Sequence, residues 1–198
     1  MGRVSRAQAQ EHRGQVVGAA GRLFKERGVG AVSVADLMSE VGLTHGGFYR
    51  QFSSKDALLA ETVAASFTGL LGELAERDVA HAVDHAAARA ALIDYYLSPE
   101  HRNDAAGGCP TAGFCIDVAR CGDDRTRDAY RSGVTEFARW LTPLEGQDDL
   151  QQDDGAVADE GLATLSTMVG ALILARAAGD GDLSERILSA ARNQLREA

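Results

Sequence analysis

The sequence is poor in proline, the residue that most strongly interrupts helices. Only three prolines occur in 198 residues, and β-branched residues seldom cluster. Alanine-rich and leucine-rich stretches are frequent instead, and both residues favour helices. Apolar residues make up 45% of the chain, which is enough for a core and too many for a disordered chain. We therefore predict an all-α fold.

Cysteine is also scarce, with only Cys109, Cys115 and Cys121. Three cysteines do not make a disulfide framework, and no CxxC motif occurs. If all three lay on one helix, each step of six residues would rotate the side chain by about 600° and raise it by roughly 9 Å. The thiols would then face three directions, which disfavours both a metal cluster and a disulfide.

Histidine does not supply a metal or catalytic site. The five histidines are scattered, and neither an HExxH motif nor a Ser/His/Asp arrangement is present. His81 and His85 have the i, i+4 spacing of a metal pair, but no third ligand is placed with them, so a solvated helix end is the favoured interpretation. We expect no metal, no cofactor and no enzymatic activity.

Long apolar runs are absent as well. No run of 18 apolar residues occurs, and the polar N-terminus has no apolar signal core. We therefore expect a cytoplasmic protein without a membrane span.

Charge is distributed unevenly along the chain. The net charge is −9, yet residues 1–60 carry eight basic and five acidic residues and are therefore at +3, which leaves −12 for the remainder. A basic first third on an acidic protein favours an anion-binding end joined to a solubilising body. The excess is modest, and chance variation is the alternative.

Apolar residues at helical spacing, together with capping and stop signals, predict a series of helices. Ser33, Thr44 and Ser54 are predicted N-caps, and Gly28 and Gly42 are predicted helix stops. Residues 143–159 are acidic and without a period, which predicts a loop. The predicted helices are 7–27, 34–41, 44–52, 55–80, 85–97 (closed by Pro99), 110–121, 124–141, 159–178 and 183–195.

The second and third of these helices flank a short glycine-containing turn, which is a helix-turn-helix arrangement. The third is very short and ends in aromatic and basic residues. Phe48 and Phe52 are spaced i, i+4 and supply its inner face, so Tyr49 must point elsewhere.

The stretch VGAAGRLFKERGVGAVSVADLMSEVGLTHGGFYRQFSSKDALL resembles the DNA-binding domain of the TetR family of one-component bacterial repressors. The resemblance covers residues 13–60 without a gap. GCPTAGFCIDVAR is also similar to one branch of the family, in which a Gly-Cys pair begins the seventh helix. The resemblance implies a helix-turn-helix domain at residues 1–54 and a ligand-binding and dimerisation domain at residues 55–198. It also implies a homodimer that leaves an inverted-repeat operator in double-stranded DNA when a small molecule binds.

The resemblance and the residue chemistry together assign a set of DNA contacts. Tyr49 and Lys55 are expected at phosphates, His45 and Arg50 at bases or phosphates, and the caps Ser33 and Thr44 beside phosphate-facing N–H groups. For each side chain a structural or solvated role is the alternative, and Arg3, Arg6 and Arg13 could add arm contacts. The expected DNA-binding residues are Ser33, Thr44, His45, Gly46, Gly47, Tyr49, Arg50 and Lys55.

Gly46 and Gly47 stand side by side where a helix is predicted, although each glycine in a helix interior costs roughly 1 kcal/mol relative to alanine. Small residues here would let the backbone approach DNA closely. Gly46 fits the family motif. In the TetR family, the position that matches Gly47 more often carries a side chain that touches a base. We therefore expect Gly47→Thr to change operator preference with little loss of stability.

A ligand pocket is expected among the apolar residues that follow the DNA-binding domain, although each of them could equally be plain core. An apolar and partly aromatic lining would favour a lipophilic effector. The expected lining residues are Phe67, Leu71, Leu92, Tyr96, Cys109, Phe114, Val118, Tyr130 and Phe137. The expected dimer contacts are Leu162, Leu165, Val169, Leu172 and Ile173, with the apolar face of residues 124–141.

Cys109 supports two alternatives. It stands at the start of a predicted helix, where the helix dipole can lower the pKa of a thiol, so modification by an electrophile or oxidant could be the signal. A thiol-dependent enzyme or binder is the other alternative, and no positioned base supports it. The sequence leaves repressor and activator open.

Overall fold

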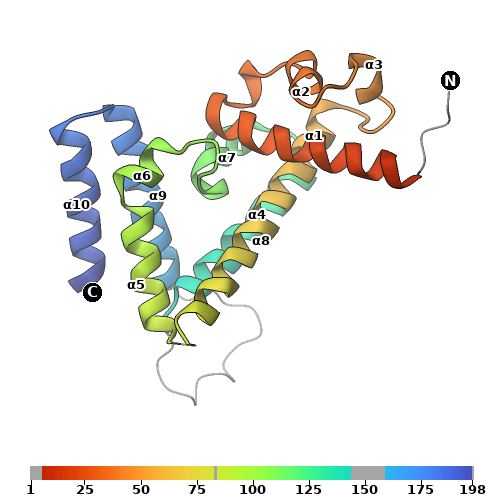
Figure 1. The fold of residues 1–198 in the computed structure, drawn as a ribbon. Coiled ribbons are helices and arrows are strands. Elements are labelled where there is room, and N and C mark those ends of the chain that lie inside the picture. The colour runs from red at the N-terminus through yellow and green to blue at the C-terminus, as the bar shows by residue number, and fades with distance from the viewer. Residues whose placement is uncertain (1–5, 83, 144–158, 198) are drawn as a thin grey trace. The chain divides into compact units, whose positions relative to one another are not determined.

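The computed structural model describes residues 6–82, 84–143 and 159–197. Every regular element in these ranges is helical, which confirms the predicted fold class (Figure 1). The elements are α1 (Arg6–Arg27), the 3-10 turn η1 (Val29–Ala31), α2 (Val34–Glu40), α3 (His45–Phe48), α4 (Lys55–Ala80), α5 (His85–Tyr96), α6 (Pro99–Asn103), α7 (Pro110–Arg120), α8 (Asp124–Leu141), α9 (Asp159–Ala178) and α10 (Asp182–Glu197).

Most predicted helices agree with the observed bounds to within two residues, and α4, α8 and α9 agree at both ends. The helix predicted to end at Phe52 ends at Phe48, although the amides of Gln51 and Phe52 still donate to Phe48 O at 2.8 and 2.9 Å. The acidic loop predicted between α8 and α9 lies outside the described residues over positions 144–158.

The prediction missed α6. Pro99 was expected only to close the preceding helix, but it is the first residue of a new one. The hydroxyl of Ser98 caps this helix by accepting from the His101 amide at 3.2 Å. Serine followed by proline is the pattern of an N-cap and a first helical residue, so the signal was present in the sequence.

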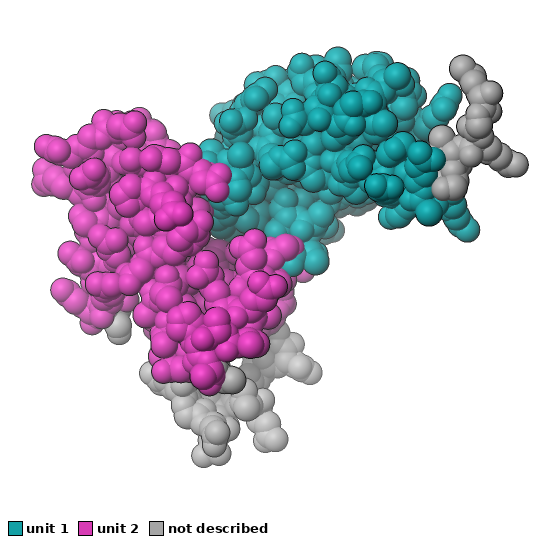
Figure 2. All heavy atoms as spheres, viewed as in Figure 1, with its two compact units in different colours: residues 1–68, 105–131 teal, residues 69–104, 132–198 magenta. Residues whose placement is uncertain are grey.

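The chain forms two compact units, coloured separately in Figure 2. Unit 1 contains residues 1–68 and 105–131, and unit 2 contains residues 69–104 and 132–198. The helices α4 and α8 each contribute to both units. The domain boundary predicted between residues 54 and 55 falls at the start of α4, inside unit 1, and remains a prediction.

Each unit has its own apolar core. Phe24, Phe48 and Phe114 are fully buried in unit 1, where they come from α1, α3 and α7. In unit 2, α10 packs along α9, and Phe137, Met168 and Leu172 are fully buried. These residues anchor each helix by its apolar face, which is the main source of helix stability in a folded protein.

Two helices, α4 and α9, are long and apolar enough to cross a membrane when judged by length and composition alone. The core helices of soluble proteins pass the same test, so the finding is weak evidence for a membrane span. In α9, Leu165 and Leu172 are buried within unit 2, which accounts for part of its apolar character without a membrane.

The contact between α8 and α9 requires a glycine. A Cβ atom on Gly161 would overlap the backbone carbonyl of Ala138 and would lie 2.5 Å from Thr142 Oγ1. Backbone atoms cannot move aside as a flexible side chain can. The first turn of α9 therefore lies against the last turns of α8 only because position 161 has no side chain.

We predict that Gly161→Ala lowers the free energy of unfolding by about 1–3 kcal/mol, because the added methyl group forces the two helices apart. Chemical denaturation followed by circular dichroism measures the change. Gly72→Ala in α4 is the matched control, because a Cβ there meets nothing within 4 Å. This control should be neutral or stabilising by roughly 0.5–1 kcal/mol. Equal stability of Gly161→Ala and the wild type would contradict the close contact.

Candidate DNA-binding surface

The helix α2 is held at both ends by the predicted signals. At its start, the Asp36 amide donates to Ser33 Oγ at 3.1 Å and the Ser33 amide donates to Asp36 Oδ2 at 2.8 Å, which completes a capping box. The hydrogen bond from the Ser33 hydroxyl, followed by that from its amide, lowers the pKa of Asp36 below its usual range. At its end, Gly42 has φ +67°, a conformation that glycine adopts readily, and Leu43 N donates to Met38 O at 2.8 Å.

Aromatic rings hold the inner face of the short helix α3 in the core of unit 1. Phe48 and Phe52 are 0% and 2% exposed, and their ring centroids lie 5.4 Å apart. Thr44 occupies the N-cap position, but its hydroxyl does not cap the helix. The serine cap of α4 forms as predicted, because the Ala57 amide donates to Ser54 Oγ at 3.0 Å.

The outer side of α3 presents polar and aromatic groups to solvent. Tyr49 is 61% exposed, in agreement with the argument that Phe48 and Phe52 occupy the inner face. Its ring lies edge-on to the ring of His45, with centroids 5.7 Å apart. His45 and Arg50 are exposed as well, as are the cap residues Ser33 of α2 and Thr44 of α3, and together these residues are the candidate surface.

The two adjacent glycines face in different directions. A Cβ at Gly46 would meet nothing within 4 Å and would point into open space. A Cβ at Gly47 would lie 3.4 Å from Met38 Cε and 3.8 Å from Thr44 Oγ1. Position 46 therefore lies on the outward side of α3, whereas position 47 points toward α2, a distinction that the sequence did not reveal.

Lys55 has a structural partner on the inner side. Its ammonium donates to the backbone carbonyl of Val29, and it lies 5.7 Å from the centroid of the Phe24 ring. An ammonium has three donors, so a phosphate contact would have to share the group with Val29. The predicted phosphate contact at Lys55 remains a prediction.

Arg13 joins three segments of unit 1. Its guanidinium makes a two-pronged pair with the carboxylate of Glu61 in α4 and donates to Gln51 O, just after α3. It also lies 4.2 Å from the centroid of the Phe52 ring. The arm contact suggested for Arg13 is therefore not supported. Arm contacts with DNA were also suggested for Arg6, which is exposed, and for Arg3, which lies outside the described residues.

The helix α7 packs against α1 within the same unit. Lys25 crosses α7 at Gly113, where an added Cβ would lie 2.6 Å from Lys25 Cγ, and its ammonium donates to Gly108 O at 2.7 Å. Asp117 Oδ2 accepts from the Val29 amide at 3.2 Å. The peptide groups of Val29 are thus bound by α7 through the N–H and by Lys55 through the carbonyl. The sequence predicted neither contact, because it contains no signal for partners so far apart.

The predicted ligand-lining residues in unit 1 come from α4, α7 and α8 and from Cys109, the residue before α7. Phe67, Phe114 and Val118 are buried, and the Phe67 ring lies edge-on to the Tyr130 ring at 5.7 Å. The Tyr130 hydroxyl donates to Thr111 O at 2.8 Å, and burial raises the pKa of Tyr130 above its usual range. The hydroxyl of Thr111, a residue that sequence reasoning missed, is buried without a hydrogen-bond partner among the described residues.

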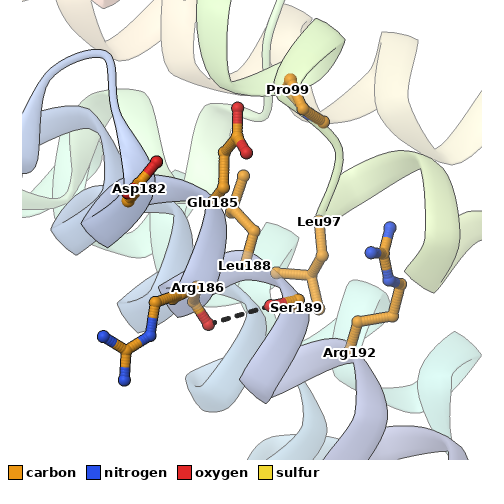
Figure 3. Close-up of a pocket in the computed structure, with 8 residues that line it drawn as sticks. All are labelled: Leu97, Pro99, Asp182, Glu185, Arg186, Leu188, Ser189 and Arg192. Carbon is orange, nitrogen blue, oxygen red and sulfur yellow. Dashed lines mark hydrogen bonds between the residues drawn. The ribbon is translucent and has the colours of Figure 1, made fainter.

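The remaining predicted lining residues belong to unit 2. Leu92, Tyr96 and Phe137 are buried and Leu71 is half-buried, which matches the alternative that they are plain core. None of these four residues lines the open groove of about 500 Å³ beside α10 (Figure 3). That groove has apolar and charged side chains, and it is lined by Leu97, Pro99, Asp182, Glu185, Arg186, Leu188, Ser189 and Arg192.

The three cysteines lie in unit 1 and are not joined in a disulfide. Cys109 is the N-cap residue of α7 and is buried, and its thiol does not cap the helix. Cys115 donates to Ala112 O at 3.3 Å, and burial raises the pKa of its thiol. Within the described ranges, histidine, cysteine and carboxylate side chains do not gather in a group of three or more that could hold a metal.

The apolar side chains of α9 divide between the core and the surface. Leu165 and Leu172, predicted dimer contacts, are 3% and 0% exposed inside unit 2, so they are not available on a surface. Leu162 is 37% exposed, and Val169 and Ile173 are half-buried. Leu174, which was not predicted, is 60% exposed. On α8, Phe137 and Leu141 are likewise fully buried.

Three comparisons place the chain among known proteins. Residues 16–62 match the model of the bacterial regulatory proteins of the tetR family. An uncharacterised HTH-type transcriptional regulator of Mycobacterium tuberculosis is 30% identical over 178 residues, which cover 86% of this chain and 87% of that protein.

Solved structures share the fold over nearly the whole chain. A TetR-family regulator from Agrobacterium tumefaciens has a TM-score of 0.76 at 20% identity, with 96% of this chain and 97% of that chain covered. The reduced form of Escherichia coli NemR has a TM-score of 0.75 at 17% identity, with 94% and 97% covered. Proteins of this family are DNA-binding regulators and not enzymes. The chain belongs to the TetR family of bacterial transcriptional regulators.

Proposed function

We propose that this regulator is a homodimeric, cytoplasmic repressor that binds an inverted-repeat operator and leaves it when a small molecule binds. The observation that carries the proposal is the outer side of α3, where His45, Tyr49 and Arg50 are exposed above a fully buried Phe48. A short helix whose inner face is buried in the domain and whose outer face is polar is suited to enter the major groove.

The exposed side chains divide naturally into two roles. Arg50 can donate two hydrogen bonds to a guanine or to a phosphate, and His45 stands at the N-terminal end of α3, the end that reaches base edges. Tyr49 has a ring and a hydroxyl suited to the sugar-phosphate backbone. Gly46, which faces open space, lets the backbone of α3 come close to the bases, because no side chain separates them.

Dimerisation would use the exposed side of α9 together with α8. Leu162 and Leu174 leave apolar area at the surface of one protomer, along with the half-buried Val169 and Ile173. Small residues between them, such as Ser166 and Gly170, would allow two helices to approach closely. Two copies related by a two-fold axis would place two α3 helices on the two halves of an inverted repeat.

The effector would be lipophilic and would carry a hydrogen-bonding group. Phe67, Phe114 and Tyr130 supply apolar and aromatic surface in unit 1, and the buried Thr111 hydroxyl lacks a partner that a ligand could provide. Movement at the start of α7 would reach the DNA-binding helices through the bonds from Lys25 to Gly108 O and from Val29 N to Asp117. Release by modification of Cys109 remains the alternative, although the buried position of Cys109 disfavours direct attack by a reagent.

The operator proposal predicts a retarded band when the folded dimer is mixed with the DNA upstream of its own gene. The affinity should fall steeply with salt, because bound arginine and lysine residues displace counterions from phosphates. A gel shift at several salt concentrations measures both effects. Absence of a retarded band at low salt, with a dimer confirmed by light scattering, would rule the proposal out.

The orientation of the two glycines predicts opposite outcomes for two matched variants. Gly46→Ala adds a methyl group that points outward, so it should weaken operator binding or change base preference while leaving stability unchanged or slightly higher. Gly47→Ala adds a methyl group beside Met38, so it should affect stability first and base preference little. Binding-site selection from a randomised operator, with thermal melts, distinguishes them. A change in base preference for Gly47→Ala alone would reverse the assignment.

Arg13 should position α3 without touching DNA. Arg13→Lys keeps the charge but loses the fork that holds Glu61 and Gln51 O, so we expect roughly tenfold weaker operator binding. The slope of log affinity against log salt should stay unchanged. Arg50→Ala is the comparison: a phosphate contact at Arg50 would reduce the slope by about 0.9 when lost, whereas a guanine contact would show as a change of base preference. A reduced slope for Arg13→Lys would mean that Arg13 contacts DNA after all.

A further inference from the structure

Three residues from three helices form a closed ring of hydrogen bonds in unit 2, through their side chains and one backbone carbonyl. Asp78, near the end of α4, lies with Oδ1 3.0 Å from Nδ1 of His85, the first residue of α5. Trp140, near the end of α8, donates from Nε1 to Asp78 Oδ2 at 2.8 Å. His85 Nε2 lies 2.8 Å from Trp140 O, and the two rings meet edge-on with centroids 4.9 Å apart. The ends of α4, α5 and α8 that carry these residues can be followed in Figure 1.

Both ring nitrogens of His85 face atoms that can only accept. One partner is a carboxylate oxygen and the other is a backbone carbonyl oxygen. Neutral imidazole has a single N–H and can donate to only one of them. With the proton on Nε2, a lone pair of Nδ1 would face the carboxylate, and with the proton on Nδ1, the Trp140 carbonyl would lose its donor. Only the imidazolium form satisfies both partners.

A cation at this position also suits the end of α8. Trp140 O and Leu141 O are among the last carbonyls of that helix, and Arg89, one turn after His85, donates from Nε to Leu141 O at 2.7 Å. The guanidinium continues to Thr164 Oγ1 at 3.2 Å, in α9. Cations are favoured at the C-terminal end of a helix dipole, so Arg89, and His85 when it is protonated, can act as charged caps supplied by α5.

We propose that His85 is a pH-sensitive link. It joins the last turn of α4 to the end of α8 when it is protonated and releases them when it is neutral. Loss of the proton removes one of the two hydrogen bonds and the charge opposite Asp78. The helix α4 is continuous from Lys55, beside the candidate DNA-binding surface, to Ala80. The link would therefore let pH change how strongly the C-terminal end of α4 is bound to α8. The proton binding itself is independent of the proposed repressor function.

The groups around His85 leave Asp78 as its direct counter-charge. His81 is turned to its own helix, with Nδ1 2.9 Å from Arg77 O, and Asp84 caps α5 by accepting from the Ala87 amide at 3.0 Å. Arg89 is engaged with Leu141 O, and Glu160 lies 3.9 Å from Arg89. The charged and titratable residues next to these three in sequence are Arg77 and His81 at the end of α4, Asp84 before α5, Arg89 on α5 and Arg139 on α8, and Glu160 on α9 is linked to them through Arg89.

The fluorescence of Trp140 reports on this link, because Trp140 is the only tryptophan of the chain and its ring contacts that of His85. A protonated imidazole quenches an adjacent indole more strongly than a neutral one. We expect the fluorescence of the full-length protein to rise in one step as the pH increases and the imidazolium beside Trp140 loses its proton. His85→Gln should abolish the step, and Asp78→Asn should move it to lower pH.

His81→Gln is the matched control, because it removes a nearby histidine that does not face Trp140, and it should keep the step. The midpoint of denaturant unfolding provides a second readout. In the wild type it should fall as the pH rises through the fluorescence step, since the bonds made by the imidazolium are lost, and in His85→Gln this dependence should disappear. A step that persists in folded His85→Gln, or the absence of any step in the wild type, would overturn the proposal.

Discussion

The guanidinium of Arg13 is the contact on which the candidate DNA-binding surface depends. It holds α4 through Glu61, the chain after α3 through Gln51 O, and the underside of α3 through the Phe52 ring. Because α3 has only four helical residues, its own hydrogen bonds cannot fix its direction. Its orientation is set by these external contacts and by the burial of Phe48. The charge of Arg13 is neutralised by Glu61, and Lys25 and Lys55 bind backbone carbonyls, so part of the basic excess of the first 60 residues serves the fold.

The sequence predicted the elements of the fold well, because local signals determine them. Caps at Ser33 and Ser54 and a stop at Gly42 set helix ends, and the spacing of Phe48 and Phe52 placed Tyr49 outside. The roles of Arg13 and Lys25 could not be predicted, because their partners lie 48 and 83 residues away along the chain. The directions of Gly46 and Gly47 also could not be predicted, since neighbouring helix residues point about 100° apart and four helical residues are too few to show which of them faces outward.

The surface between subunits was harder to predict than the fold for a related reason. The helix α9 is apolar around its whole circumference, so periodicity does not separate the side that faces the core from the side that faces a partner. Leu165 and Leu172 proved to face the core, while Leu174 remains exposed. The ligand-lining residues raise the same difficulty, because a buried phenylalanine has the same sequence signature in a pocket wall as in a packed core.

The discontinuity of unit 1 has a consequence for the modular exchange of domains. In a chimera of two regulators of this family, the DNA-binding part of one protein is joined to the effector-binding part of another. A junction at residue 54 would leave behind Gly108, which accepts from Lys25, and Asp117, which accepts from Val29. The transplanted head would keep its sequence specificity but lose the two bonds that connect it to α7. A functional chimera should therefore carry residues 105–131 together with the head, or restore these two contacts with matched side chains.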